Sequence, residues 1–307
     1  LFRSRDTLVQ RRENLLRQIG YAIVNRRLQR ATRQANPPFR NAGFGTGDVF
    51  EAGRTTSLAV DTVDGKWQRG LTEAALEYRR ALAFGFSAAE VAEQVANIRA
   101  ANVNAAASAD TRSNGSLYGA VLALLREDIV PGSPQSSLER LDAFIPEITP
   151  EKVLAALKRE AVPLDDPLLR FQGRREPEGG AKALRAAWDA AARQKLVQGE
   201  AAAATGFAYT QFGPAGAVVS DTTEPLLGIR QIRFANGVRL NLKKTDLDKE
   251  RVTVQLSIDG GDMLASAANP LATEMVPVFA AGGLGKHSQD ELQSLVAGRT
   301  VSTGLSS

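Results

Sequence analysis

The residues best suited to chemistry are scarce, since the chain of 307 residues has one histidine, His287, and no cysteine. These two counts exclude zinc sites with two histidines, thiolate metal sites, cysteine nucleophiles and disulfides within this chain. A Ser-His-Asp triad would need His287, which follows the Gly-rich stretch 282–286. We expect His287 at the surface, where it could also contact a substrate or another part of the protein.

The remaining candidates for chemistry are weaker. Gly43, Gly45 and Gly47 form a G-x-G-x-G pattern, but no strand precedes it and no suitably spaced helix follows, so a flexible loop is predicted rather than a phosphate site. The stretch 259–262 has too few acidic residues for an all-protein calcium site.

The charge balance is mildly basic: 38 Lys and Arg stand against 34 Asp and Glu, and the isoelectric point is near 9.5. The basic residues are dispersed over predicted helices, usually opposite acids, which indicates a solvated surface and no nucleic-acid partner. No apolar run reaches the roughly 18 residues of a membrane-spanning helix. The lack of cysteine fits a cytoplasmic protein or a periplasmic one without disulfides.

A hairpin is the best-marked element. Asn236-Gly237 separates two runs with alternating apolar residues, which predicts two strands joined by a type I′ turn. The run 252–258 repeats the alternation and predicts a further strand. A sheet that begins this late in the chain indicates either two domains or a chain that has been cut.

The earlier part of the chain is mainly helical. Apolar residues recur at helical spacing, and Ser87 with Glu90, like Ser288 with Glu291, has the spacing of a capping box. Strands are predicted at 55–62 and 168–171, which makes the fold class α+β. The predicted helices span residues 6–34, 67–82, 87–107, 116–127, 137–144, 150–159, 182–195, 271–281 and 288–296.

The order of these elements resembles the pitrilysin/insulinase-type zinc metallopeptidase family, in particular its bacterial members with two homologous halves. The hairpin, the following Gly260-Gly261 pair, a helix, a Gly-rich loop and Ala-Gly-Arg-Thr-Val at 297–301 resemble the opening of one half. Four earlier stretches resemble the second domain of the preceding half: 21–28, 85–90, 127–128 and 148–151.

This resemblance implies metallopeptidase-like α/β roll domains, in which helices cover one face of an antiparallel or mixed sheet. Residues 1–170 would be the second domain of the first half, without its N-terminal strands. Residues 171–228 would be an interdomain linker, and residues 229–307 the start of a third, non-catalytic domain that is cut short.

The family's zinc motif is the inverted H-x-x-E-H, with two histidine ligands and a glutamate base. Aligned on the Gly-Gly pair, its positions fall on Thr273, Val276 and Pro277, which can neither bind zinc nor act as a base. The resemblance therefore implies that this chain holds no catalytic or metal residue, and that Zn2+ is bound upstream in the full-length enzyme. Family members use an Arg to orient substrate, which makes Arg26 and Arg27 candidates, although the dipole near a helix C-terminus would also favour them.

The function implied is the substrate-enclosing, non-catalytic portion of a zinc-dependent metalloendopeptidase, with peptides or unfolded proteins as substrate and an upstream catalytic domain as partner. A dimer is possible, and a periplasmic or exported location is expected, with a cytoplasmic one as alternative. One rival is a non-catalytic structural or partner subunit of the same superfamily. Another is an unrelated α+β binding module that uses the basic helix 6–34, with Arg11, Arg12 and Arg17.

Overall fold

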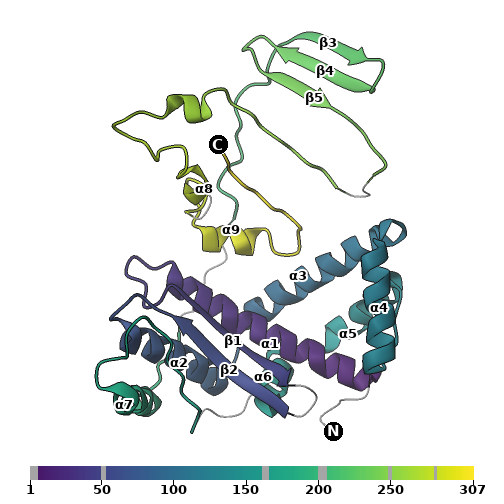
Figure 1. Cartoon of the computed structure of the whole chain (residues 1–307). Coiled ribbons are helices and arrows are strands. Elements are labelled where there is room, and N and C mark those ends of the chain that lie inside the picture. The colour runs from purple at the N-terminus through teal and green to yellow at the C-terminus, as the bar shows by residue number, and fades with distance from the viewer. Residues whose placement is uncertain (1–5, 50–52, 161–165, 200–205, 248–250, 280–281) are drawn as a thin grey trace.

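The structure is a computed structural model that describes residues 6–49, 53–160, 166–199, 206–247, 251–279 and 282–307. The predicted α+β class is confirmed, since helices are combined with two small antiparallel sheets. In Figure 1 the lower part of the molecule holds the long helices and a two-stranded sheet, and the upper part holds a three-stranded sheet.

Seven helices and two strands make up the described chain as far as residue 193. The strands pair in antiparallel register, with Phe44 opposite Leu58. The elements are α1 (Leu8–Thr32), β1 (Asn41–Val49), β2 (Gly53–Asp61), α2 (Trp67–Phe84), α3 (Ala88–Ala107), α4 (Asn114–Glu127), α5 (Pro134–Phe144), α6 (Pro150–Glu160) and α7 (Gly180–Arg193), with short 3-10 turns at Ala109–Thr111 and Ile145–Glu147.

The core is built on α1. Ile19, Ile23 and Val24 on α1 are almost fully buried, and they pack in one cluster with Val153 and Leu157 of α6. Residues four apart on a helix share a face, so this spacing gives α1 a continuous apolar stripe. Phe44 of β1 and Tyr78 of α2 complete the cluster, with ring centroids 4.6 Å apart.

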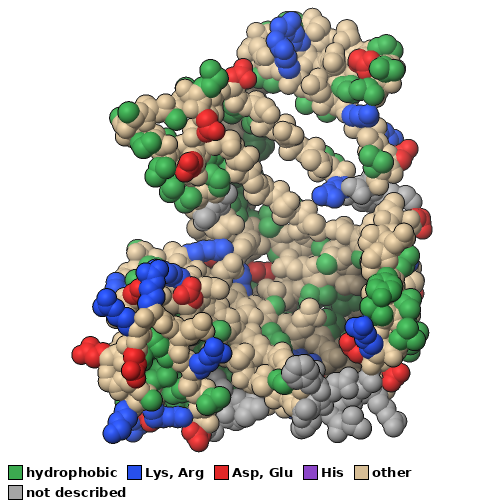
Figure 2. All heavy atoms as spheres, in the orientation of Figure 1, with side chains coloured by type: hydrophobic (Ala, Val, Ile, Leu, Met, Phe, Trp, Pro, Cys, Tyr) green, Lys and Arg blue, Asp and Glu red, His purple; other side chains and the backbone are tan. Residues whose placement is uncertain are grey.

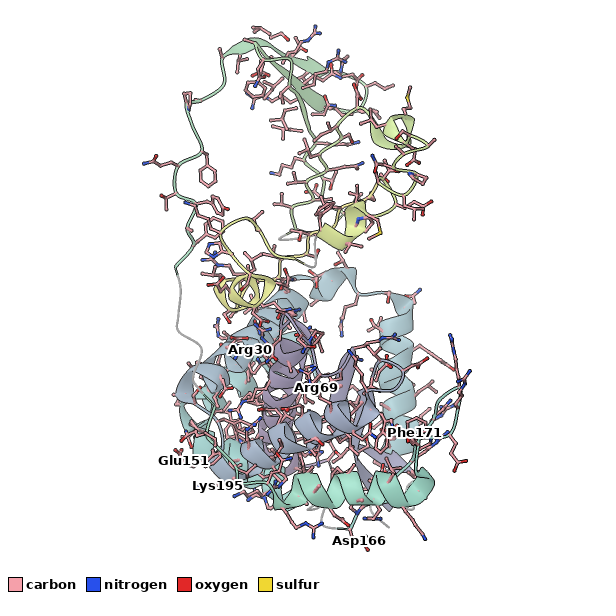
Figure 3. The ribbon with its side chains drawn as sticks, turned by 90° about the vertical axis from the view of Figure 1, so that its left-hand side faces the viewer. Arg30, Arg69, Glu151, Asp166, Phe171 and Lys195 are labelled. Carbon is pink, nitrogen blue, oxygen red and sulfur yellow. The ribbon has the colours of Figure 1, made fainter. Side chains whose placement is uncertain are left out.

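A smaller apolar cluster attaches α7 to α2. Trp188 of α7 is buried against Ala75 and Leu71 of α2. Arg185 of α7 forms an ion pair with Asp166 at 3.1 Å, and Figure 3 shows Asp166 beside this helix. The predicted domain boundaries at residues 170 and 228 stay a prediction. The predicted linker, residues 171–228, contains α7, which packs on the predicted domain of residues 1–170.

The remaining elements lie in the upper part of Figure 1, apart from α9, which rests on the lower part. The three-stranded sheet has the order β3-β4-β5, with neighbouring strands antiparallel. The elements are β3 (Val218–Glu224), β4 (Ile229–Phe234), β5 (Arg239–Leu242), α8 (Val276–Phe279) and α9 (Gln289–Leu295), with a 3-10 turn at Gly261–Leu264.

The predicted hairpin is confirmed, but its turn type was wrong. Gly237 has a positive φ of 89°, whereas Asn236 does not share it. The Gly237 N–H donates to the Phe234 carbonyl at 3.0 Å, and the Phe234 N–H donates to the Val238 carbonyl at 2.9 Å. This is a three-residue loop that ends on a left-handed glycine, not the two-residue type I′ turn.

Three strand or loop predictions were wrong. Gly43, Gly45 and Gly47 lie in β1 rather than in a loop, because backbone pairing with β2 accepts residues without side chains. Residues 168–171 are irregular. Residues 252–258 also form no ladder, and their four apolar side chains are 80 to 88% exposed, because alternation specifies a face but supplies no partner strand.

The helix predictions hold with one exception. Both capping boxes, at Ser87 with Glu90 and at Ser288 with Glu291, are formed. The helix predicted at 271–281 was too long: residues 271–275 are turns and α8 covers only Val276–Phe279. The end of that predicted helix, residues 280–281, lies outside the described residues.

The buried stripe of α1 generates a test of the fold. Ile19 has no exposed surface, so Ile19→Ala should lower the free energy of unfolding by about 2–5 kcal/mol through lost burial and a residual cavity. Val9 on the same helix is 78% exposed, and Val9→Ala should change stability by less than about 0.5 kcal/mol. Urea denaturation followed by far-UV circular dichroism measures both. Equal effects of the two variants would contradict the assigned core.

Candidate functional site

A cleft of about 520 Å³ lies at the meeting point of α1, the start of β1, α3 and α9. Its lining is polar and rich in side-chain amides. Figure 3 shows α9 directly above the end of α1, where Arg30 is labelled. The lining residues are Ala22, Asn25, Arg26, Gln29, Asn41, Ala42, Glu93, Gln94, Asn97, Gln293, Val296 and Arg299.

Arg26, one of the two residues predicted to bind substrate, lies in this cleft. Its guanidinium donates to the Asp290 carboxylate at 2.7 Å and to the Asp290 carbonyl at 2.9 Å. A longer bond of 3.4 Å joins it to Glu93 of α3. The side chain is only 10% exposed, so Arg26 links three helices from within the cleft wall.

Asp290 places α9 against α1 and α3. Arg33, at the end of α1, also pairs with its carboxylate. Carboxylates in the first turn of a helix are favoured by the positive end of the helix dipole, and Asp290 and Glu291 both lie there. Further along, Ser294 donates to Glu93 and the Gly298 N–H donates to Asn97, each at 2.9 Å. Polar contacts therefore form this wall of the cleft.

Asn25 shows what an amide in this cleft can do. Its Nδ2 donates to the Phe44 carbonyl at 2.9 Å, and its Oδ1 accepts the Phe44 N–H at 2.8 Å. These two hydrogen bonds resemble the pairing between neighbouring strands, and both are made to main-chain atoms of Phe44. Gln29, Asn41, Gln94 and others among the lining residues carry the same group, which can both donate and accept hydrogen bonds.

Arg27, the second predicted residue, lies outside the cleft and is held by its own surroundings. It donates to both carboxylate oxygens of Glu90, at 2.7 and 2.8 Å, and to the Gly85 carbonyl at 3.0 Å. Its guanidinium also lies over the Phe86 ring, 5.4 Å from the centroid. The structure thus separates the two candidates, Arg26 in the cleft wall and Arg27 in a clamp between α1 and the start of α3.

Glu90 has a perturbed pKa. Burial raises the pKa of its carboxyl, but hydrogen bonds from Arg27 and from the Ser87 N–H together outweigh burial and hold the pKa below its ordinary value. The carboxylate also completes the capping box of α3. Glu90 therefore stays ionised in the folded protein at neutral pH. Its carboxylate takes part both in the capping box of α3 and in the ion pair with Arg27.

The expectation that His287 lies at the surface was wrong, because the side chain is 4% exposed. Its Nε2 accepts the Ala208 N–H at 2.8 Å, and its ring stacks on Phe207 at a centroid distance of 5.3 Å. The segment that supplies this contact lies 79 positions away at Ala208, so the loop sequence around His287 gave no sign of it.

The positions aligned with the zinc motif lie apart from the cleft lining. Thr273 is in a turn, where its carbonyl accepts the Ser307 hydroxyl at 2.9 Å, and Val276 and Pro277 open α8. Their side chains offer none of the nitrogen, sulfur or carboxylate ligands that zinc uses. Across the described ranges, His, Cys, Asp and Glu form no group of three or more that could hold a metal. The residues within these ranges do not fit zinc.

Sequence reasoning missed most of the cleft. Asp290 contacts Arg26 across 264 residues, a contact that no local pattern encodes. A signal did exist on α3, where Asn97 and Asn104 both bond the chain near its end. Asparagine is a poor helix former, so its recurrence in a helix indicates a use beyond helix stability.

No family model matches the sequence, and no curated protein matches it. Several solved structures are similar. A mutant of the ferredoxin protease FusC in complex with Arabidopsis ferredoxin is 15% identical with a TM-score of 0.46, over 75% of this chain and 26% of that one. The periplasmic protease PqqL from Escherichia coli is 16% identical with a TM-score of 0.46, over 94% and 32%.

A protein described as a predicted insulinase family protease from Yersinia pestis is 21% identical with a TM-score of 0.44, over 60% of this chain and 39% of that one. The chain spans about a quarter to a third of the length of the first two. All three neighbours are described as proteases, and one of them as an insulinase family protease.

The clamp at Arg27 generates a pH-dependent prediction. Glu90→Gln should lower the free energy of unfolding at pH 7 by about 1–3 kcal/mol, because Arg27 loses an ionised partner in a half-buried place. The folded-state pKa of Glu90 lies below its ordinary value of 4.5, so its contribution is present above that pH and is lost as pH falls through the folded-state pKa.

Denaturation curves of the protein and of Glu90→Gln between neutral and acid pH measure this difference. The gap between them should close in acid. Glu178→Gln, at an exposed position, is the matched control and should follow the unmodified protein throughout. A gap that widens as pH falls would contradict the assigned role of Glu90.

Proposed function

We propose that this chain is the non-catalytic, substrate-enclosing portion of a zinc-dependent metalloendopeptidase that hydrolyses peptides or unfolded proteins. The observation that carries this proposal is the amide-rich cleft at α1, α3 and α9, with Arg26 in its wall. A cleft that addresses main-chain atoms suits a substrate defined by its backbone rather than by one sequence.

The non-catalytic part of the proposal rests on residue types. A single histidine cannot build a two-histidine zinc motif, and Thr273, Val276 and Pro277 occupy the aligned positions. Zn2+ would then be bound by the upstream catalytic domain of the same protein, which supplies the activated water. This chain would contribute binding, by holding an extended substrate beside that domain.

The cleft charges support an extended peptide as ligand. The charged lining residues are Arg26, Arg299 and Glu93, and Arg26 is already bonded to Glu93 and Asp290. Most of the remaining polar lining is neutral amide, which donates and accepts equally. We therefore propose no nucleic-acid partner, since a phosphate backbone needs a clustered basic surface.

The alternative, a structural or partner subunit of the same superfamily, is favoured by one surface. Leu117, Val121, Leu124 and Leu125 leave a largely exposed apolar face on α4, visible in Figure 2 as hydrophobic side chains gathered at the right. Such a face is typical of contact with another protein surface, including a second copy. A catalytic upstream domain or a separate subunit could each cover it.

The proposed location is periplasmic or exported, with a cytoplasmic one as alternative. Among the helices that the structure describes, none combines the length and apolar character of a membrane crossing. Fractionation of cells that express the full-length protein would distinguish the two locations.

Peptide binding tests the cleft directly. A fluorescein-labelled unstructured peptide should bind the chain, and a peptide of shuffled sequence should bind with similar affinity. Gln29→Ala combined with Gln94→Ala removes two lining amides and should weaken binding about thirtyfold, at roughly 1 kcal/mol for each lost hydrogen bond. Gln18→Ala, exposed on α1 outside the lining, is the control. Fluorescence anisotropy measures the affinity of the unmodified chain, the double variant and the control. Equal affinities of all three proteins would contradict the assignment of the cleft.

Metal analysis tests the non-catalytic assignment. After dialysis against buffer with micromolar zinc, the purified chain should carry far less than one equivalent of zinc by inductively coupled plasma mass spectrometry. It should also leave a fluorogenic peptide uncut over hours. One tightly bound equivalent of zinc, or hydrolysis that a chelator stops, would place a metal centre in this chain and contradict the proposal.

A further inference from the structure

A second hollow, of about 340 Å³, lies between the N-terminal half of α1, the end of α5 and α6. It shares no lining residue with the amide-rich cleft. Leu16 and Phe144, buried to 6% and 5% exposure, form an apolar floor. Val9 and Ala155 at the rim are exposed and apolar. The hollow thus offers an apolar compartment that opens to solvent.

The charges around it leave one cation in excess. Arg159 donates to both carboxylate oxygens of Glu13, at 2.8 and 2.7 Å, and this pair is neutral as a unit. Glu147 is shared by two cations over longer distances, 3.3 Å to Arg12 and 3.8 Å to Lys152. One carboxylate therefore faces two positive groups.

Arg12 is the cation whose hydrogen-bond donors are not all used by the described residues. Its guanidinium lies over the Phe144 ring, with Cζ 4.7 Å from the centroid. Its Nε is buried and, within the described part of the chain, has no hydrogen-bond partner. A buried N–H without an acceptor is unfavourable, and a guanidinium can donate two parallel hydrogen bonds from one edge to a carboxylate. Among the residues that the structure describes, the Arg12 Nε therefore has no anionic acceptor.

We infer that this hollow binds a carboxylate carried on a short apolar chain. The carboxylate would pair with the guanidinium of Arg12 near Lys152, and the apolar chain would cover Leu16 and Phe144. The volume is at the small end of ligand pockets, so it suits a single apolar side chain or a medium-length hydrocarbon. The C-terminal residue of a peptide and a free fatty acid share this chemistry.

Four small molecules test the site on the whole chain. N-acetyl-leucine represents a peptide C-terminus and octanoate a fatty acid, and N-acetyl-leucinamide and octanol are their neutral counterparts. Saturation-transfer NMR and calorimetric titration should show saturable carboxylate binding with dissociation constants on the order of 1–10 mM, as expected for ligands of this size. Each neutral analogue should bind about tenfold more weakly. Binding of one carboxylate alone supports the site and identifies its source.

Three variants locate the binding. Arg12→Gln should weaken carboxylate binding about tenfold through loss of a charged hydrogen bond. Ala155→Phe fills the hollow from an exposed position, keeps every charge and should abolish binding of octanoate. Lys158→Gln, exposed on the same helix but outside the lining, is the control and should leave affinity within about twofold.

If Arg12→Gln unfolds, Ala155→Phe still tests the site, because its exposed position leaves the core intact. Octanol that binds as well as octanoate would overturn the inference, since the hollow would then be only apolar. Octanoate binding that survives Ala155→Phe would also overturn it, as would carboxylate dissociation constants well above about 10 mM.

Discussion

The buried stripe of α1 is the contact on which the rest of the structure depends. Ile19, Ile23 and Val24 hold α6 and β1 together through one helix. The other faces of that helix carry Arg12, Arg26 and Arg27, each facing a different set of neighbours. An α-helix rises about 1.5 Å per residue, so Arg12 and Arg26 lie about 21 Å apart along a rigid axis. The apolar hollow and the amide-rich cleft are therefore separate sites on one scaffold.

The arginines of α1 differ in what holds them. Arg27 has a bidentate partner in Glu90, a carbonyl and an aromatic ring, so its charge is fully engaged in half-buried surroundings. Such a pair offsets its own desolvation and serves mainly to fix one arrangement of α1 and α3. Within the described ranges, Arg12 has one long hydrogen bond to Glu147, and its Nε has no partner there. Arg27 therefore has a structural role between α1 and α3, whereas Arg12 is the arginine that we propose binds a ligand.

The sequence was sufficient for the local elements. Helical periodicity located α1 to α7, and Ser87 with Glu90 marked a helix start to the residue, because capping is a contact between near neighbours. It failed where pairing is distant. Gly43 and Gly45 joined a strand since β2 supplies the ladder, and residues 252–258 stayed outside one since no partner is present among the described residues. His287 was misplaced because its partner Ala208 lies far away in the chain.

The residues of the candidate site also divide into those that the sequence could predict and those that depend on distant contacts. Arg26 was found through a family resemblance, and its presence in the cleft wall follows from the helix that carries it. Its partner Asp290 could not be predicted, because tertiary packing alone brings residues 264 positions apart together. The amides of the cleft were visible as composition on α3, but their meaning depended on the facing wall. The sequence showed which polar residue types were present, but it did not show that the fold brings them together in one cleft.

The described chain from residue 206 onward has a different physical character from the part that precedes it. Only His287 is buried there, so no apolar core fixes its position. Its contacts with α1 and α3 are polar, through Asp290, Ser294 and Gly298. Hydrogen bonds of this kind contribute about 0.5–3 kcal/mol each, the larger values applying to charged groups such as Arg26 and Asp290. The wall formed by α9 is therefore held by polar contacts, whereas α1 is held by the apolar core. Under the function proposed above, a cleft with one wall set by the apolar core and one held by polar contacts would admit chains of different bulk, while the amides on α1 and α3 would keep the main chain in register.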